Sequence, residues 1–403
     1  MKKSIVGSLL LTLAACSSQV NVSRDPSAQR KNLQVEKIDT YLGEVYEQDE
    51  DAAIQRVIGA AMGALRRDFK PPHVPRDAHA KSHGCLKASF SVNNSALPPE
   101  LRVGLFASNK SYPTWVRFSN NTSDPMSHDK DLDLRGIAIK VMNVPGTKVI
   151  PAEATAQTQD FLMFASPIFF VKDIKDYAEF IKALGDGKAF QDLLFKRPRS
   201  LVQLATAQLL AKGKKNPLKL TYFSAVPFRL GQASNPARRP VKYSVTACDP
   251  KAIKNEPNGD PSRRDFMREA LKESLDQRGA CFLFQVQVGD PKRPDVYPVE
   301  DPSILWPTER SIRNPLTISP YKTVATLRIP KRDDFDTEER NEFCEHLSFT
   351  PWHALPEHKP LGRTNRMRLK LYEHISAYRH RANGVEKREP MTLDPQTAYP
   401  DSK

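Results

Sequence analysis

The sequence has 403 residues, of which 61 are lysine or arginine and 47 are aspartate or glutamate, for a formal net charge of +14. A surplus of this size can favour nucleic acid or anionic lipid as a partner. Basic and acidic residues alternate along the chain, however, and no arginine-rich arm interleaved with aromatic residues occurs. The composition therefore argues against nucleic-acid binding.

The N-terminus has the features of an export signal. Lys2 and Lys3 form a short positive segment, and residues 5–13 form an apolar run that is too short to span a bilayer. The run ends in the sequence LAAC, which closes with Cys16. This ending resembles the lipobox of bacterial lipoproteins.

A lipobox implies lipidation of the Cys16 sulfur and removal of residues 1–15 as a signal peptide. Several acyl chains on one cysteine anchor a protein stably, at roughly 0.8 kcal/mol per buried CH₂. Ser17 rather than aspartate follows, which in such lipoproteins implies the periplasmic face of the outer membrane. Loss of Lys2 and Lys3 would lower the net charge by two, from +14 to +12. The alternative is an ordinary secretory signal with an incidental cysteine.

The chain after the lipid site divides by composition. Residues 16–34 are polar and unpatterned and are predicted to form a tether. Residues 35–70 are predicted to form an N-terminal helix, because apolar side chains recur at helical spacing and two prolines follow. Residues 71–385 are predicted to be one large domain, and residues 386–403 a polar tail.

The predicted elements of the large domain are mostly strands. Alternation or short apolar runs predict strands over 89–92, 115–119, 137–141, 168–171, 281–288 and 324–329. Helical spacing predicts helices over 176–184, 201–210, 337–347 and 367–379. The chain also has 33 prolines and no internal repeat. We therefore expect an α+β fold with an antiparallel β-rich core, peripheral helices and room for a cofactor.

Four cysteines remain after Cys16, and their spacings are long. The absence of a CxxC pair argues against a zinc site. An oxidising compartment permits disulfides, but four cysteines allow three pairings, which the sequence leaves open. Cys85 and Cys281 lie in apolar, strand-like runs, where a buried thiol is the expected state.

Several short motifs follow one another in this domain. In chain order they are Arg76-x-x-His79 with Gly84, WVRFS at 115–119, DLRGIAIK at 133–140, Asp160 followed by SPIFF at 166–170, Trp306-Pro307, and Arg368-x-x-x-Tyr372 with Arg379. Together they resemble the catalase superfamily, in its divergent branch that includes catalase-related peroxidases and coral allene oxide synthase. The resemblance extends, with gaps, over most of the chain. It implies an antiparallel β-barrel core of the catalase type that binds haem b.

The resemblance also implies roles for the motif residues. Arg76, Arg117 and Arg379 match the family's propionate-binding arginines. His79 matches the histidine on the distal face of the haem. Tyr372 matches the proximal tyrosine that ligates the iron.

The chemistry suits these residue types. A tyrosine oxygen on iron must be a phenolate, although the free phenol has a pKa of about 10. Arg368, one helical turn before Tyr372, would lie on the same helix face and favour the anion. An anionic axial ligand can support O–O cleavage by pushing electron density to the iron. His79 would take a proton from one peroxide oxygen and return it to the other.

The sequence departs from the family pattern on the distal side. The asparagine that orients peroxide in the family aligns with Phe164, or with Ala165 after a slip of one residue, and neither side chain can donate a hydrogen bond. An apolar wall there favours a bulkier apolar hydroperoxide or slow turnover. Tyr177 falls where the family often stacks an aromatic ring on the haem.

The identity of the distal base stays open at this point. His83 lies four residues after His79, on the same face of the predicted strand, and is an alternative base. Arg76 and Gly84 fall into family register with His79, which favours His79.

These observations predict a haem-dependent, catalase-like peroxidase that acts on hydrogen peroxide or on organic or lipid hydroperoxides. The alternative is a haem-binding lipoprotein with little or no catalysis. A third possibility is a basic lipoprotein that binds no haem. The implied partners are a peroxide and, through Cys16, a membrane of the bacterial cell envelope. The sequence leaves open whether the chain forms a homo-oligomer.

Overall fold

The computed structural model describes residues 37–399, except Leu132, scattered positions between 187 and 214, and residues 310–317. Cys16, the signal peptide at 1–15 and the tether at 16–34 lie outside the described residues, as does most of the helix predicted over 201–210. In the part that is described, no helix is both long and apolar enough to cross a membrane.

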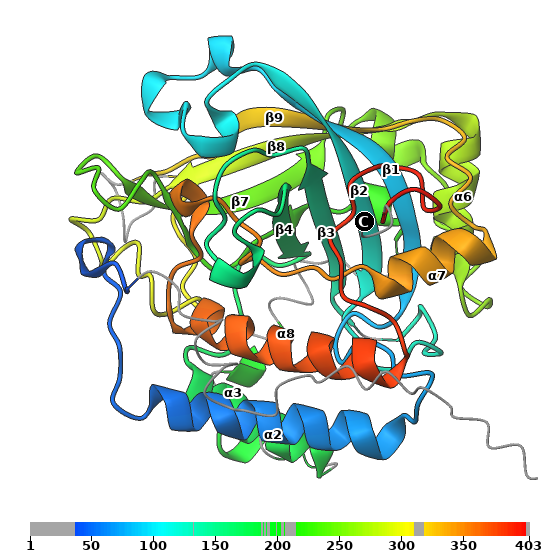
Figure 1. Cartoon of the computed structure of the whole chain (residues 1–403), viewed down its shortest axis with the longest axis horizontal. Helices are drawn as coiled ribbons and strands as arrows, with labels where there is room; N and C mark the ends of the chain where they lie inside the picture. Colours follow the sequence, from blue (N-terminus) through cyan, green and yellow to red (C-terminus); the bar gives the residue numbers. More distant parts are fainter. Residues whose placement is uncertain are drawn as a thin grey trace, which may run out of the picture.

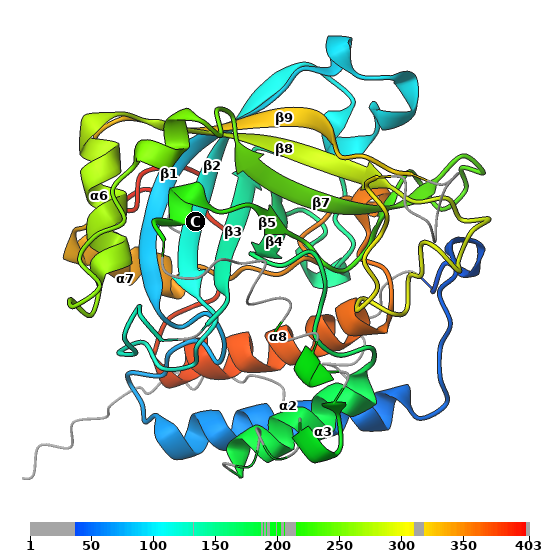
Figure 2. The same ribbon diagram turned by 180° about the vertical axis from the view of Figure 1, so that it is seen from behind.

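One antiparallel sheet closes into a barrel (Figures 1 and 2). Its strands are β1 (Ser82–Val92), β2 (Lys110–Asn120), β3 (Arg135–Met142), β4 (Thr158–Phe164), β5 (Tyr222–Phe223), β6 (Phe228–Leu230), β7 (Arg239–Ala247), β8 (Ala280–Val288) and β9 (Lys322–Ile329). The strand order is β5-β4-β3-β2-β1-β9-β8-β7-β6. Because β5 pairs with both β4 and β7, eight strands form the closed ring and β6 extends it beside β7. This confirms the predicted α+β fold with an antiparallel barrel.

The alternation of side chains along each strand separates the interior of the barrel from its outer face. On β2, Val116 and Phe118 are fully buried in the main hydrophobic cluster. Arg117 and Ser119, which alternate with them along β2, therefore point to the outer face. This arrangement leaves polar side chains on the outside of the barrel to build a site.

Most of the predicted strands are present, but the one predicted over 168–171 is wrong. Strand β4 ends at Phe164, and residues 165–171 form bends instead. The Ser166 hydroxyl donates a hydrogen bond to the Ile168 carbonyl oxygen at 2.9 Å, and the Phe169 N–H bonds to the Pro302 oxygen. These apolar side chains are held by a local turn rather than by strand pairing.

Five helices carry labels in Figure 1: α2 (Glu50–Asp68), α3 (Ile174–Gly185), α6 (Phe266–Gln277), α7 (Glu338–His346) and α8 (Arg363–Ala382). Helices α2, α3 and α8 share one hydrophobic cluster, and α8 lies between the barrel and the other two (Figures 1 and 2). Of these three helices, α8 is therefore the one that faces the outer surface of the barrel.

The N-terminal helix begins later than the predicted range of 35–70. Gly43, with φ of 90°, follows a short 3-10 turn at Thr40–Leu42. The Glu44 carboxylate accepts a hydrogen bond from Arg366 at 2.8 Å and another from the Gly362 N–H. Contacts with the start of α8 therefore hold this segment outside a helix.

All four cysteines of the described chain form disulfides, so the expectation of buried thiols at Cys85 and Cys281 is wrong. Cys85 pairs with Cys344, and Cys248 pairs with Cys281. The Cα–Cα distances are 5.9 and 5.4 Å, within the usual range for a disulfide. The partners come from segments that the sequence alone does not bring together.

The segment from residue 386, predicted as a tail, lies against the barrel over residues 386–399. Lys140 on β3 is fully buried and pairs with Asp160 at 2.9 Å and with Glu389 at 2.5 Å. The Trp115 indole donates to the Thr392 carbonyl oxygen, and Ala398 is fully buried. This segment covers part of the outer face of β2 and β3.

Candidate haem site between the barrel and helix α8

One face of α8 carries the predicted proximal residues. At about 100° per residue, Asn365, Arg368, Tyr372 and Arg379 fall within roughly 60° of one another around the helix. Arg368 Nε donates a hydrogen bond to the Tyr372 hydroxyl oxygen at 3.1 Å. A fixed positive charge therefore lies beside the phenol oxygen.

Asn365 is a further member of this group that the sequence analysis missed. Its side-chain nitrogen donates to the carbonyl oxygens of Pro227 and Leu361, both at 2.9 Å. These bonds turn Asn365 Oδ1 toward Arg368, whose Nη1 donates to it at 3.3 Å. Asn365 lies three residues before Arg368 on α8, but it precedes the helix predicted over 367–379, so no pattern in the sequence pointed to it.

His79 lies against a row of residues on the outer face of the barrel. Ser119 on β2 is directly opposite Gly136 on β3, and Gly136 is directly opposite Phe164 on β4. His79 Nδ1 is 2.9 Å from Ser119 Oγ. A Cβ atom added to Gly136 would lie 2.5 Å from His79 Cε1, so the glycine makes room for the ring. Directly opposite side chains share a sheet face, which places Phe164 on the same side as His79.

The surroundings of His79 keep its imidazole neutral. Burial lowers the pKa of His79 to about 3, and the charges of Arg117 and Arg368 add to this effect. A neutral imidazole at physiological pH can accept a proton. Arg368, which donates to the Tyr372 hydroxyl, is thus among the charges that act on His79.

His83 lies in a different environment. It occupies the irregularity in the pairing of β1 and β2 between Ser82 and Gly84. His83 Nε2 is 2.7 Å from Asn120 Oδ1, and burial lowers the pKa of His83 to about 4. Asn120 follows Ser119 on β2, so its side chain points to the opposite face of the strand. The structure therefore does not bring His83 to the surface on which His79 lies.

Two of the three predicted propionate arginines pair with one carboxylate, and the third lies close enough for their charges to act on it. Arg76 Nη1 and Arg379 Nη2 pair with Glu345 at 2.6 and 2.7 Å. Arg117 is 5% exposed and lies 4.6 Å from the centre of the Phe349 ring. Its Nε and Nη1 atoms have no hydrogen-bond partner within the described chain. A buried guanidinium with unused donors fits an anionic group such as a carboxylate.

Aromatic rings adjoin this region on the side of Phe164. The Phe164 and Phe169 ring centres are 6.2 Å apart, and those of Phe169 and Tyr177 are 5.7 Å apart. Burial raises the pKa of Tyr177, and the charge of Asp77 raises it further. Burial raises the pKa of Asp77 itself to about 6. Asp77 lies inside the Arg76-x-x-His79 motif, but the resemblance gave it no role.

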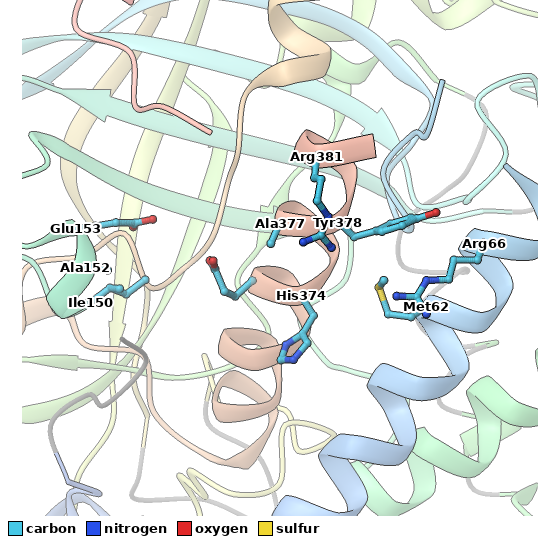
Figure 3. Close-up of a pocket in the computed structure, with 10 residues that line it drawn as sticks. Met62, Arg66, Ile150, Ala152, Glu153, His374, Ala377, Tyr378 and Arg381 are labelled. Carbon is cyan, nitrogen blue, oxygen red and sulfur yellow. The ribbon is translucent and has the colours of Figure 1, made fainter. Parts of the chain in front are cut away.

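A cavity of about 250 Å³ opens elsewhere, between α2, α8 and residues 150–153 (Figure 3). His374, Ala377, Tyr378 and Arg381 line it from α8. These positions lie on the opposite side of α8 from Tyr372. The cavity is therefore separate from the candidate site.

Comparison with solved structures defines the class of fold. The chain superposes on a fungal catalase with a TM-score of 0.59 at 17% identity, covering 79% of this chain and 61% of that one. It superposes on catalase A from Saccharomyces cerevisiae with a TM-score of 0.59 at 16% identity, covering 84% and 70%. A bacterial catalase gives a TM-score of 0.54 at 17% identity, covering 96% and 70%. The fold is the catalase fold, and the chain spans about three fifths of the fungal catalase.

Sequence comparison gives a more particular relative. The chain is 27% identical over 242 residues to a catalase-related peroxidase of Mycolicibacterium paratuberculosis, covering 57% of this chain and 69% of the relative. No protein-family model matches the sequence. The fold and this similarity together support a place for the chain in the catalase superfamily.

Proposed function

We propose that this protein is a haem-dependent peroxidase of the catalase type, acting on hydrogen peroxide or on organic hydroperoxides. The observation that carries the proposal is the hydrogen bond from Arg368 to the Tyr372 hydroxyl, on the face of α8 that also carries Asn365 and Arg379. The similarity to a catalase-related peroxidase supports the same activity.

The residues fit a haem group with two propionates. Arg117 has unused buried donors, and Arg76 and Arg379 lie in one cluster with it. Charge-assisted bonds from these guanidiniums would hold the propionate carboxylates. Tyr372 would bind the iron as a phenolate. Haem, when bound, supplies the redox chemistry that cleaves the O–O bond.

The chain's own contribution on the distal side is proton transfer. His79 is neutral, and its Nδ1 lies 2.9 Å from Ser119 Oγ, so the imidazole is oriented by Ser119 and would exchange protons with a hydroperoxide. Positioned acid–base groups of this kind accelerate reactions by about 10²–10⁴-fold. We therefore propose His79, and not His83, as the distal base.

A haem-binding protein with little catalysis is the second candidate. The observation that favours it is Phe164, which lies directly opposite Gly136 and on the same sheet face as the His79 ring. Phe164 offers no hydrogen bond to orient a peroxide. Haem binding without turnover would follow if that loss is decisive.

The test is a haem titration of the purified full chain, followed by assays of hydrogen peroxide and cumene hydroperoxide loss. We expect stoichiometric binding, a ferric spectrum of the tyrosinate-ligated type, and turnover of the organic hydroperoxide. Haem binding without turnover of either peroxide would favour the second candidate. A protein that binds no haem would contradict both.

Gly136→Ala should impair catalysis while leaving haem bound. The new Cβ would lie 2.5 Å from His79 Cε1 and 2.6 Å from Nδ1, so the ring must move away from Ser119. A displacement of about 1 Å can cost roughly a hundredfold in rate. The measurement is hydroperoxide turnover at equal haem content. Gly63→Ala on α2, where a Cβ meets nothing within 4 Å, is the control. Equal rates for both variants would contradict this arrangement.

Phe164→Asn should raise oxygen release from hydrogen peroxide. The amide would supply a donor beside His79, and one such donor is worth roughly 2.7–4 kcal/mol at a developing charge in other enzymes. We expect at least about a tenfold rise, which corresponds to 1.4 kcal/mol. Oxygen evolution is the measurement, and Phe164→Leu, which stays apolar, is the control. Oxygen release by the unaltered chain at the rate of an ordinary catalase would contradict the role given to Phe164.

We also propose that the protein is anchored by lipid on Cys16 at the periplasmic face of the outer membrane. Two disulfides support an oxidising compartment. The unaltered protein should partition with membranes, whereas Cys16→Ser should be released or left uncleaved. Fractionation and the mass of the N-terminus provide the measurement. Finding the unaltered protein wholly in the soluble periplasmic fraction would refute the anchor. An anchored protein would meet hydroperoxides of membrane lipids.

A further inference from the structure

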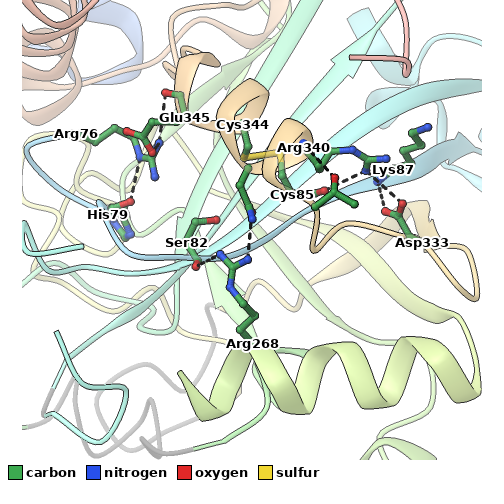
Figure 4. Close-up of a disulfide and its surroundings, with 12 residues drawn as sticks. Arg76, His79, Ser82, Cys85, Lys87, Arg268, Asp333, Arg340, Cys344 and Glu345 are labelled. Atoms are coloured by element: carbon green, nitrogen blue, oxygen red, sulfur yellow. Dashed lines mark hydrogen bonds and ion pairs between the residues drawn. A yellow bond between two sulfur atoms is a disulfide. The ribbon is translucent and has the colours of Figure 1, made fainter. Parts of the chain in front are cut away.

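Glu345 ties together two arginines that come from different parts of the fold. Its Oε2 atom lies 2.6 Å from Arg76 Nη1, and its Oε1 atom lies 2.7 Å from Arg379 Nη2. Its backbone oxygen also accepts a hydrogen bond from Arg379 Nη2 at 3.1 Å. Figure 4 shows the pair of Glu345 with Arg76. Arg76 precedes β1 and Arg379 belongs to α8, so one carboxylate links the barrel side to the helix side.

The charges of this cluster match a ligand with two carboxylates. Arg76, Arg117 and Arg379 carry three positive charges, and Glu345 carries one negative charge, which leaves a surplus of two. The arginine side chains are buried: those of Arg76 and Arg379 are 9% and 5% exposed. A surplus of two buried charges is costly unless anions offset it. The two propionates of haem supply that number.

The position of Glu345 is fixed by a covalent link. Cys344, the residue before it on α7, forms a disulfide with Cys85 on β1 (Figure 4). Arg340, one turn earlier, donates to the Cys85 carbonyl oxygen at 3.3 Å and pairs with Asp333 at 3.2 Å. Helix α7 is therefore held on β1 at the point where Glu345 reaches both arginines.

This inference rests on the proposed function, in which the site takes haem. We propose that Glu345 is a positioning residue for the propionate clamp, meaning Arg76, Arg117 and Arg379. We also propose that the Cys85–Cys344 disulfide holds Glu345 in place. The carboxylate keeps Arg76 and Arg379 at a fixed separation, so that these two guanidiniums are arranged before the ligand arrives. Preorganisation of this kind raises affinity by lowering the cost of ordering the site. The clamp selects a tetrapyrrole that carries free carboxylates.

The test compares haem with haem dimethyl ester, which keeps the ring and the iron but lacks the propionate charges. The full chain should bind haem at least about tenfold more tightly than the ester. Glu345→Gln should lower haem affinity by about tenfold or more, which corresponds to 1.4 kcal/mol, while ester affinity stays within about twofold. Glu342→Gln, an exposed glutamate on the same helix, is the control and should change neither affinity.

Each result decides the role of Glu345. An equal loss of haem and ester binding in Glu345→Gln would mean a general structural role and would overturn the inference. A gain in haem affinity would mean that Glu345 competes with the propionates, which would also overturn it. Failure of the unaltered chain to bind either compound would instead refute the proposed function.

A second variant tests the part assigned to the Cys85–Cys344 disulfide. The double variant Cys85→Ala/Cys344→Ala should lose preference for haem over the ester in the same direction as Glu345→Gln. Its circular dichroism spectrum should match that of the unaltered chain. A double variant that folds and keeps the full preference would overturn the part assigned to the disulfide.

Discussion

Tyr372→Phe is expected to fold normally and to lose most of its haem. The change removes the one oxygen on this face of α8 that receives the Arg368 Nε hydrogen bond and that would bind the iron. The aromatic ring remains, so its packing against the cluster formed by α2, α3 and α8 is kept. We expect haem affinity to fall at least about a hundredfold, which corresponds to 2.7 kcal/mol. Haem content after purification and a haem titration measure the effect.

Two further variants make this test specific. Tyr378→Phe removes a phenol on the opposite side of α8, beside the separate cavity, and should leave haem binding unchanged. Arg368→Leu should retain part of the haem but shift the ferric spectrum, because the phenolate loses its neighbouring positive charge. If Tyr372→Phe binds haem with an unchanged spectrum, Tyr372 is not the ligand.

Alternation and short apolar runs predicted an antiparallel β-rich core, and the resemblance to the catalase superfamily implied that this core is a barrel. The contrast between 115–119 and 168–171 shows the limit of that reasoning. Residues 115–119 alternate, whereas residues 168–171 are a continuous apolar run. Before that run, Ser166 and Pro167 turn the chain after β4, and the apolar side chains are buried without strand pairing. Apolar composition indicates burial in both places, whereas pairing depends on partners that are distant in sequence.

The candidate site was predictable where the spacing of residues reflects local geometry. Arg368 and Tyr372 are four apart on one helix, so their contact follows from helical periodicity. Glu345 was missed because its partner Arg76 lies 269 positions away in the sequence, and no local pattern connects them. The pairing of Cys85 with Cys344 was left open for the same reason.

The choice between His79 and His83 also needed three-dimensional information. Four residues along a regular strand share a face, so spacing placed both histidines together. The irregular pairing at Ser82 and Gly84 breaks that relation and directs His83 toward Asn120. His79 lies before β1 begins, with φ of 57°, and is carried instead onto Gly136.

His79→Ala is expected to retain haem and to lose peroxidase turnover. His79 would bind no iron, so its removal leaves the Tyr372 bond and the arginine cluster intact. Loss of the proton-transferring group should lower the turnover of an organic hydroperoxide by about 10²–10⁴-fold. Hydroperoxide loss at equal haem content is the measurement.

The pH dependence of the reaction provides an independent check on that role. Because burial lowers the pKa of His79 to about 3, its imidazole is neutral throughout pH 5–8 and should give no inflexion in the rate profile there. An inflexion near pH 6 that disappears in Asp77→Asn would belong to Asp77, whose pKa burial raises to about 6.

His83→Ala should keep the turnover of the unaltered chain if it folds, because His83 bonds to Asn120 and not to Ser119. Turnover lost in a folded His83→Ala but kept in His79→Ala would move the base to His83, and the role assigned to His79 would be wrong.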